Sequence, residues 1–278
     1  MGKIIWLASY PKSGNTWLRV FLHNLLRNPD RPWDINKISK FSTGDSNTEL
    51  YKPFDPRPAT EYTVKDIARM RPLVQAALMQ ASRDNVFVKT HNALVEDHGY
   101  PAINLEVTAG TIYVVRSPLD VVISYANHMA LPIDKMIEIM AEKGARTGIN
   151  EIVVSEKTSS WSENVASWTA TPHPTLLVVR YEDMHAEPIK TFGGVARFLG
   201  LKPPRERLDK AIKMSSFKVV QEQERRHGFF EKSPMSERFF RVGTSGQWRA
   251  ILTPEQVAKI VADHREQMAR FGYVPEDY

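Results

Sequence analysis

The chain of 278 residues is 42% hydrophobic and 25% charged, contains no cysteine, and carries a formal net charge of +5. This composition is typical of a globular protein with a large core, and the lack of cysteine excludes disulfide bonds and thiolate metal sites. No apolar run approaches the roughly 18 residues that a membrane span needs, and the first residues lack the pattern of a signal peptide. We therefore expect a single domain over residues 1–278, a cytoplasmic location and no membrane span.

The positive charge favours an anionic ligand. Lys and Arg are nevertheless spread along the chain, without a basic run or a nucleic-acid-binding signature. We therefore expect no nucleic-acid partner.

The first stretch, residues 4–28, combines a strand, a polar turn and a helix. Residues 4–8 have the length and apolar composition of a buried strand. Residues 9–16 are dense in small and hydroxylated side chains, and apolar residues then recur at helical spacing. Because the first N–H groups of a helix and its dipole favour an anion, this turn predicts a phosphate site. Gly14 lets the backbone approach the ligand, and Lys12 adds a positive charge.

This turn is not a Walker A loop, which needs the order Gly-Lys-Ser/Thr. Asn15 follows Gly14 where the lysine should be, and Lys12 lies two residues before the glycine. The pattern predicts phosphate binding by backbone amides, by Lys12 and by the hydroxyls of Ser13 and Thr16, without an obvious metal site. The alternative is an ordinary strand, turn and helix with polar surface residues.

The segment that follows has two possible interpretations. Residues 29–62 predict irregular structure, which is either a functional loop or a loop packed down by its aromatic side chains. We expect a helix over residues 63–82, kinked or divided at Pro72, and a short strand over residues 85–88.

Two strand ends carry basic residues. Lys89 and His91 follow the strand over residues 85–88, and positions two apart on a strand face the same side, so both can enter one cleft. A strand over residues 111–116 ends at Arg116, and a helix capped by Ser117 and Asp120 follows. Ligands of open α/β sheets bind at this edge. The other seven histidines, His128 among them, have no such context.

The rest of the chain predicts helices around one further strand. We expect helices over residues 133–145, 160–170, 188–199, 205–214 and 254–271, a strand over residues 175–183, a polar loop over residues 215–250, and a possible mobile lid within residues 130–160. Alternating strands and helices predict an α/β fold with a mainly parallel sheet flanked by helices, in a P-loop-like architecture.

Several stretches together resemble one family, the sulfotransferases that use 3′-phosphoadenosine 5′-phosphosulfate (PAPS). Residues 10–17, YPKSGNTW, resemble the family's 5′-phosphosulfate loop. Residues 116–120, with Ser124, resemble its 3′-phosphate motif, and residues 243–249 its C-terminal Gly-x-x-Gly-x-Trp motif. Residues 89–91, Lys-Thr-His, are similar to the strand end that carries the family's catalytic base. The matches follow the family's order and look most like bacterial enzymes that modify small molecules.

The resemblance implies metal-independent, in-line transfer of a sulfuryl group from PAPS to an acceptor hydroxyl, with PAP as the product. It implies His91 as the base, assisted by Lys12 and Lys89. The nucleotide contacts that it implies are Lys12, Ser13, Gly14, Asn15, Thr16, Trp17, Arg116, Ser124, Tyr181, Ser216, Phe217, Phe240, Arg241, Val242 and Gly243. Val242 departs from the family, because relatives often have a basic residue there, and Arg241 is the candidate to replace it.

The acceptor and two rival functions stay open. The acceptor is a small molecule, a glycan or a peptide natural product, and Met129, Met136 and Met140 favour an apolar or aromatic one. A P-loop kinase that uses ATP and Mg²⁺, or a non-catalytic nucleotide-binding protein, are the alternatives. A homodimer is possible, although the dimerisation motif of the animal cytosolic enzymes is absent.

Overall fold

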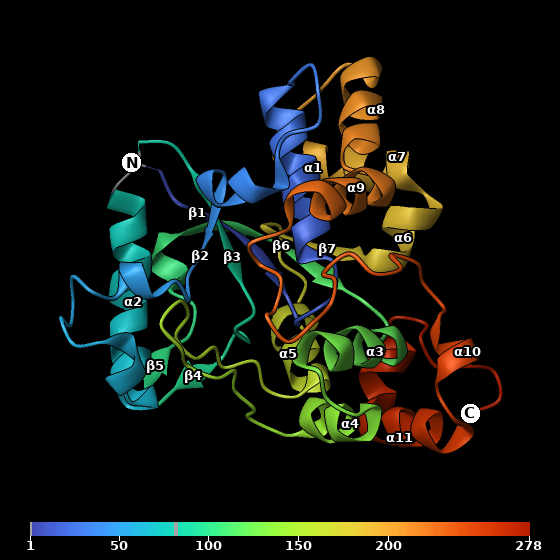
Figure 1. The fold of residues 1–278 in the computed structure, drawn as a ribbon. Coiled ribbons are helices and arrows are strands. Elements are labelled where there is room, and N and C mark those ends of the chain that lie inside the picture. The colour runs from blue at the N-terminus through green and yellow to red at the C-terminus, as the bar shows by residue number, and fades with distance from the viewer. Residues whose placement is uncertain (1, 81–82) are drawn as a thin grey trace.

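A five-stranded parallel sheet forms the centre of the computed structural model, which describes residues 2–80 and 83–278 (Figure 1). The strand order is β2-β3-β1-β6-β7, and every neighbouring pair is parallel. The strands are β1 (Ile4–Ser9), β2 (Ser42–Gly44), β3 (Val86–Thr90), β6 (Thr108–Val115) and β7 (Leu176–Arg180). A separate small hairpin pairs β4 (Glu96–Asp97) with β5 (Tyr100–Pro101).

Helices cover both faces of this sheet, as the α/β prediction requires (Figure 1). They are α1 (Asn15–Arg27), α2 (Val64–Gln80), α3 (Pro118–Met129), α4 (Ile133–Ala141), α5 (Trp161–Thr169), α6 (Tyr181–Ala186), α7 (Pro188–Phe198), α8 (Arg205–Met214), α9 (Phe217–His227), α10 (Trp248–Ile251) and α11 (Pro254–Arg270). Short 3₁₀ helices lie at Ile35–Lys40, Thr48–Leu50, Ala59–Glu61 and Leu105–Val107. No helix in the described part of the chain has the length and apolar character needed to cross a bilayer.

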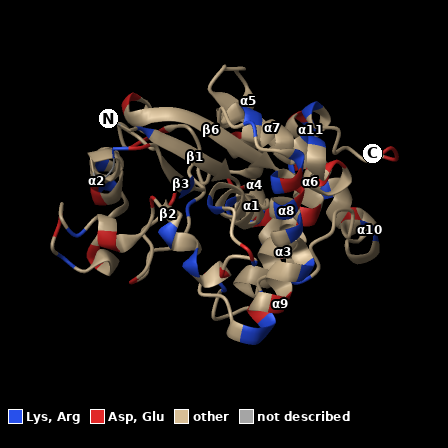
Figure 2. Ribbon diagram, turned by 90° about the horizontal axis from the view of Figure 1, so that it is seen from above, with Lys and Arg blue, Asp and Glu red and all other residues tan. Residues whose placement is uncertain are grey.

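Alternate side chains of the central strands enter two separate cores. Trp6 and Tyr113 pack in the core that α3, α4, α5 and α11 close, whereas Leu7 and Ile112 pack in the core that α1, α7 and α8 close. All four side chains are buried. In a parallel sheet with helices on both faces, side chains on both sides of a strand are buried, so the strands are apolar along almost their whole length. Charged side chains lie outside these cores, and Figure 2 shows both signs recurring on the outer helices.

Four strands end at the same edge of the sheet. The turn after β1, the end of β3, Arg116 after β6 and Tyr181 after β7 therefore come together, although they are far apart in sequence. This is the edge at which open α/β sheets bind ligands.

The structure changes parts of three predicted elements. The helix α2 continues through Pro72 as one element, which excludes the predicted division and leaves the predicted kink as the alternative. The predicted end at residues 81–82 lies outside the described residues. The strand predicted within residues 175–183, with its end at Arg180-Tyr181, does end at Arg180, and Tyr181 begins α6. The predicted helix over residues 133–145 stops at Ala141.

Several elements within the predicted loops were missed, and α9 and β2 were missed because they lack an apolar pattern. The helix α9 lies within residues 215–250 and buries only Val220 and Glu224. The strand β2 lies within residues 29–62 and has the sequence Ser-Thr-Gly.

We predict that Leu7→Ala lowers the free energy of unfolding by about 2–5 kcal/mol, because it opens a cavity in a fully buried site. Leu105→Ala is the matched control, since Leu105 is 62% exposed, and we expect a change within about 0.5 kcal/mol. Urea unfolding measures both values. Equal losses in the two variants would contradict this view of the core.

Candidate active site

A cavity of about 850 Å³ opens at the carboxyl edge of the sheet. The turn after β1, the end of β3, α3, the start of α6 and residues 217–247 contribute to its wall. Most of the predicted site residues line it: Lys12, Gly14, Asn15, Thr16, Trp17, Lys89, His91, Arg116, Ser124, Tyr181, Phe217, Phe240, Arg241, Val242 and Gly243. Ser13 and Ser216 lie outside this lining.

The turn after β1 is held in shape by its own polar atoms. The side-chain amide of Asn15 donates to the carbonyl oxygen of Leu7 (2.8 Å) and to the Ser9 hydroxyl (3.3 Å). Gly14 has a φ of 106°, and a Cβ there would lie 2.6 Å from the Tyr181 ring, so only glycine fits. The buried hydroxyl of Ser13 has no hydrogen-bond partner. The turn thus leaves polar atoms free beside a helix N-terminus.

Lys12 places a buried cation in this turn. Its backbone φ is 64°, in the left-handed region that residues other than glycine seldom adopt. The ammonium lies 3.8 Å from the centre of the Phe239 ring. Burial lowers the pKa of Lys12 to about 7, and the neighbouring charges of Arg116 and Lys89 contribute in the same direction. An anion bound here would relieve this repulsion.

Arg116 joins two loops of the site. Its guanidinium donates to the carbonyl oxygen of Lys12 (3.1 Å) and to that of Thr244 (3.2 Å), and it lies 4.1 Å from the centre of the Tyr181 ring. The buried Nε atom has no partner. Arg116 therefore has a donor left for a ligand while it fixes the protein around it.

Two carboxylates hold the cover segment, which we define as residues 239–249, over the cavity. Asp120 accepts from the backbone N–H groups of Gly246 (2.6 Å) and Trp248 (3.1 Å). Glu224 accepts from those of Phe239 (2.6 Å) and Phe240 (2.8 Å).

The predicted start of α3 is confirmed in position, since Ser117 is the N-cap residue and Pro118 the first helical residue, but the predicted capping bonds are wrong. The Ser117 side chain makes no capping bond, and the Asp120 carboxylate instead holds the cover segment.

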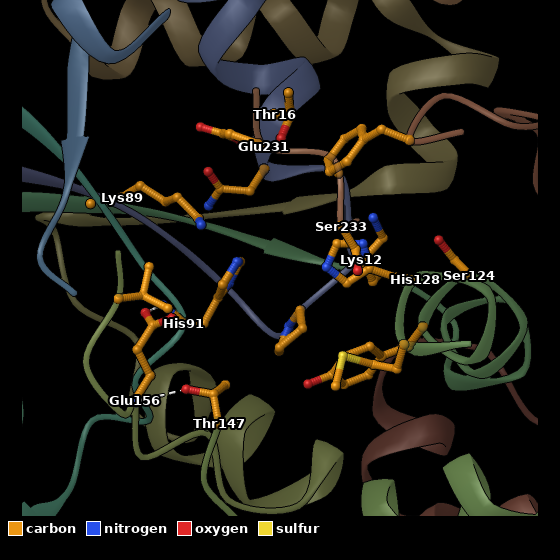
Figure 3. A pocket seen from close by; sticks show the side chains of 18 of the residues that line it. Lys12, Thr16, Lys89, His91, Ser124, His128, Thr147, Glu156, Glu231 and Ser233 are labelled. Atoms are coloured by element: carbon orange, nitrogen blue, oxygen red, sulfur yellow. Dashed lines mark hydrogen bonds between the residues drawn. The ribbon is translucent and has the colours of Figure 1, made fainter. Parts of the chain in front are cut away.

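His91 is fixed in one tautomer. Its Nδ1 atom lies 2.8 Å from the carbonyl oxygen of Ser9. A carbonyl can only accept, so the hydrogen-bond pattern assigns the proton to Nδ1 and leaves a lone pair on Nε2. Burial lowers the pKa of His91 to about 4, and the charge of Lys89 adds to this effect. The ring is therefore neutral at pH 7, and Figure 3 shows it close to the Lys89 side chain.

The backbone around His91 is also held. The Glu156 carboxylate accepts from the N–H of His91 (2.7 Å), and the Asn164 amide donates to its carbonyl oxygen (3.1 Å). The next residue, Asn92, accepts from Arg71 and from the backbone N–H of Lys157 (2.7 Å). This buried network orients the strand end that carries the imidazole.

Comparisons with known proteins show the family of this chain. The model of the sulfotransferase domain family matches residues 3–272. This chain belongs to the sulfotransferase family. Among curated relatives, the luciferin sulfotransferase of Photinus pyralis is 24% identical over 98% of this chain and 73% of its own length. Sulfotransferase 1A1 of Mus musculus is 25% identical over 95% of this chain and 84% of its own length.

Solved structures share the fold of this sulfotransferase. Mouse sulfotransferase SULT7A1 complexed with PAP has a TM-score of 0.63 and 21% identity, over 98% of this chain and 90% of that one. Retinol dehydratase in complex with androsterone and PAP has a TM-score of 0.67 and 18% identity, over 95% of this chain and 80% of that one.

His128, Glu156 and Glu231 are among the residues that line the cavity of this sulfotransferase but were not predicted from the sequence. His128 lies four residues after Ser124 in α3, on the same helix face, and this spacing was an available signal. Burial lowers its pKa to about 3, with smaller contributions from Lys12 and Lys89. Figure 3 shows it beside Lys12.

No local pattern marked the two missed glutamates. Glu231 forms an ion pair with buried Arg19, whose Nη1 atom donates to both carboxylate oxygens at 2.7 and 3.0 Å. Glu156 lies in an irregular segment before α5. Among the described residues, no three His, Asp or Glu side chains group as metal ligands would.

We predict that Gly243→Ala destabilises the cover segment. Gly243 has a φ of 67°, and a Cβ there would lie 2.0 Å from the Phe217 ring. Overpacking costs about 1–3 kcal/mol, so tryptic cleavage within residues 238–249 should accelerate about tenfold or more. Gly272→Ala is the control, because Gly272 has the same φ of 67° and no atom within 4 Å of the added Cβ. Equal cleavage rates in the two variants would argue against the Phe217 contact.

Proposed function

We propose that this chain transfers a sulfuryl group from PAPS to a hydroxyl group of an acceptor, with His91 as the general base. One observation carries the proposal: a neutral imidazole with Nε2 free lies in the same cavity as an anion-binding turn and two lysines. Membership of the sulfotransferase family supports it. Two of the structural neighbours are complexes with PAP, which supports PAPS as the donor.

The residues at the sheet edge fit the two anionic ends of PAPS. The backbone N–H groups at the start of α1, the Ser13 hydroxyl and Lys12 suit the 5′-phosphosulfate. The unpartnered Nε of Arg116 and the nearby Ser124 and Arg241 suit the 3′-phosphate. Trp17 and Tyr181, whose ring centres are 5.7 Å apart, suit the adenine. When bound, PAPS would supply an activated sulfuryl group with the 5′-phosphate as the leaving group.

His91 would take the proton of the acceptor hydroxyl on Nε2. The hydroxyl oxygen then bonds to sulfur as the bond between sulfur and the 5′-phosphate oxygen breaks. The Ser9 carbonyl keeps the ring oriented, and the Glu156 carboxylate near the backbone of His91 favours the imidazolium that results.

The lysines would stabilise charge that develops during transfer. Lys12 would neutralise the departing phosphate oxygen, and Lys89 would contact the peripheral sulfuryl oxygens, in line with the loose transition states of such transfers. We propose that these fixed cations serve where other transferases use a metal ion.

The domain organisation, the location and the partners of the enzyme are also proposals. We propose that residues 1–278 act as one domain, that the enzyme works in the cytoplasm, that homodimers are possible, and that neither nucleic acid nor a resident metal takes part.

We predict that His91→Asn lowers the rate of transfer by about 10²–10⁴-fold while leaving PAP affinity unchanged, because it removes the base but no phosphate contact. Labelled PAPS with a panel of phenols, alcohols and sugars measures transfer in the presence of EDTA, and calorimetry measures PAP binding. His98→Asn, at an exposed histidine with a φ of 49°, is the control. Wild-type turnover in His91→Asn removes the proposed base. PAP binding without transfer to any acceptor, or Mg²⁺-dependent consumption of ATP, contradicts the proposed function.

We predict that PAP binding at pH 8 takes up close to one proton. With a pKa of about 7, Lys12 is mostly neutral in the free protein at pH 8, and phosphate beside it raises the pKa, so the ammonium re-forms. Calorimetry in two buffers with different ionisation enthalpies measures the uptake. At pH 5.5 Lys12 is already charged and should contribute nothing. Lys12→Arg, which stays charged, should abolish the uptake at pH 8, and persistence there would assign the proton to another group.

A further inference from the structure

The cavity has two unlike walls on the acceptor side of His91. Tyr125 and Met129 of α3 and Met136 and Ile139 of α4 form an apolar wall. A second part of the lining, the polar wall, contains Ser46, Asn47, Thr147, Asn150 and Glu156, beside Ile149, Ile152 and Val153. The apolar wall suits a hydrophobic body, whereas the polar wall requires hydrogen-bonding groups on part of the same ligand.

Glu156 is one of the charged residues in this part of the cavity lining, together with Glu142 and Arg146. Its side chain is 6% exposed, and Figure 3 shows it next to His91 and Thr147. One carboxylate oxygen, Oε1, accepts from the N–H of His91. Within the described residues, no hydrogen bond reaches the other oxygen, Oε2. The residue therefore combines a structural bond with a free acceptor atom at the cavity.

The carboxylate of Glu156 stays ionised. Burial alone would raise its pKa, but the charges of His91 and Lys89, the bond from the His91 N–H and the charge of Arg71 outweigh burial and lower the pKa. A ligand that covers this ionised oxygen removes it from solvent, and that is costly unless the ligand donates a hydrogen bond to it. A ligand that fills this wall is therefore favoured if it donates a hydrogen bond, and one that presents an apolar or anionic group is disfavoured.

We propose that the acceptor carries a second hydroxyl group beside the one that is sulfated, and that Glu156 holds this second hydroxyl. The inference rests on the proposed function. The Glu156 carboxylate is hydrogen-bonded to the backbone of His91, and both residues line the same cavity, so we expect two neighbouring hydroxyls of one molecule to donate to Oε2 and to Nε2. The substrate class is an apolar or aromatic vicinal diol.

A neutral hydroxyl fits this position better than an ammonium group. Lys12, Lys89 and Arg116 line the same cavity and make its potential positive. His128 also stays neutral there, since burial and the nearby lysines lower its pKa to about 3. A cationic acceptor would enter against this charge.

The test compares two probes on the complex of the enzyme with PAP: 2,3-dihydroxynaphthalene, and 3-methoxy-2-naphthol, in which one donor is methylated. Calorimetry gives their dissociation constants. We expect the diol to bind about tenfold more tightly or better, as a hydrogen bond to a charged group would provide.

Glu156→Gln should abolish this preference. The Gln side chain keeps an oxygen for the His91 N–H but turns an N–H₂ group toward the cavity in place of Oε2. Glu142→Gln, at an exposed glutamate that lines the same cavity, should leave the preference unchanged.

The outcomes separate this inference from the proposed function. If neither probe binds, if both bind equally, or if Glu156→Gln keeps the wild-type ratio, Glu156 only anchors His91 and the inference is overturned. Tighter binding of 1-(aminomethyl)-2-naphthol than of the diol would also overturn it. If the enzyme sulfates 2-naphthol but shows no preference for the diol, the proposed function stands and only the inference about Glu156 fails. If the diol binds more tightly but no acceptor is sulfated, the proposed function fails and the inference about Glu156 stands.

Discussion

The organisation of this site follows from buried positive charge that the fold does not neutralise. Lys12 lies beside a helix N-terminus, with Arg116 and Lys89 close enough to lower its pKa to about 7. Such repulsion is tolerable only where rigid neighbours hold the charges in place and an anion can enter. The surrounding contacts serve this need: Asn15 ties the turn to β1, and Arg116 bonds the turn to the cover segment.

The acidic residues of the site complete this arrangement by binding protein groups. Asp120 and Glu224 accept backbone N–H groups of the cover segment, and Glu231 pairs with Arg19. Their negative charges are thus engaged with protein donors and leave Lys12 free for a ligand. Glu156 differs, since one of its oxygens supports His91 and the other faces the cavity.

The parts of the site that could be predicted are those encoded in short, contiguous patterns. The turn over residues 9–16, the strand end at His91 and Arg116 after β6 all carry local signals, and the parallel sheet follows from alternating apolar strands and helices. Contacts between residues far apart in the sequence leave no local pattern, so they could not be predicted. The helix α9 is polar on most of its surface, and Glu156 reaches His91 because Lys157 pairs with the loop after β3, through the bond of 2.8 Å from the Ala93 N–H to its carbonyl.

The conformation of Lys12 has a consequence for the molecule as a whole. Its φ of 64° is one that glycine adopts freely, and its ammonium is buried among like charges. Both the backbone and the surroundings therefore disfavour the very side chain on which the proposed chemistry depends. If Lys12 has the proposed role, the chain gives up stability at this position for function, because its backbone conformation and its burial both carry a cost.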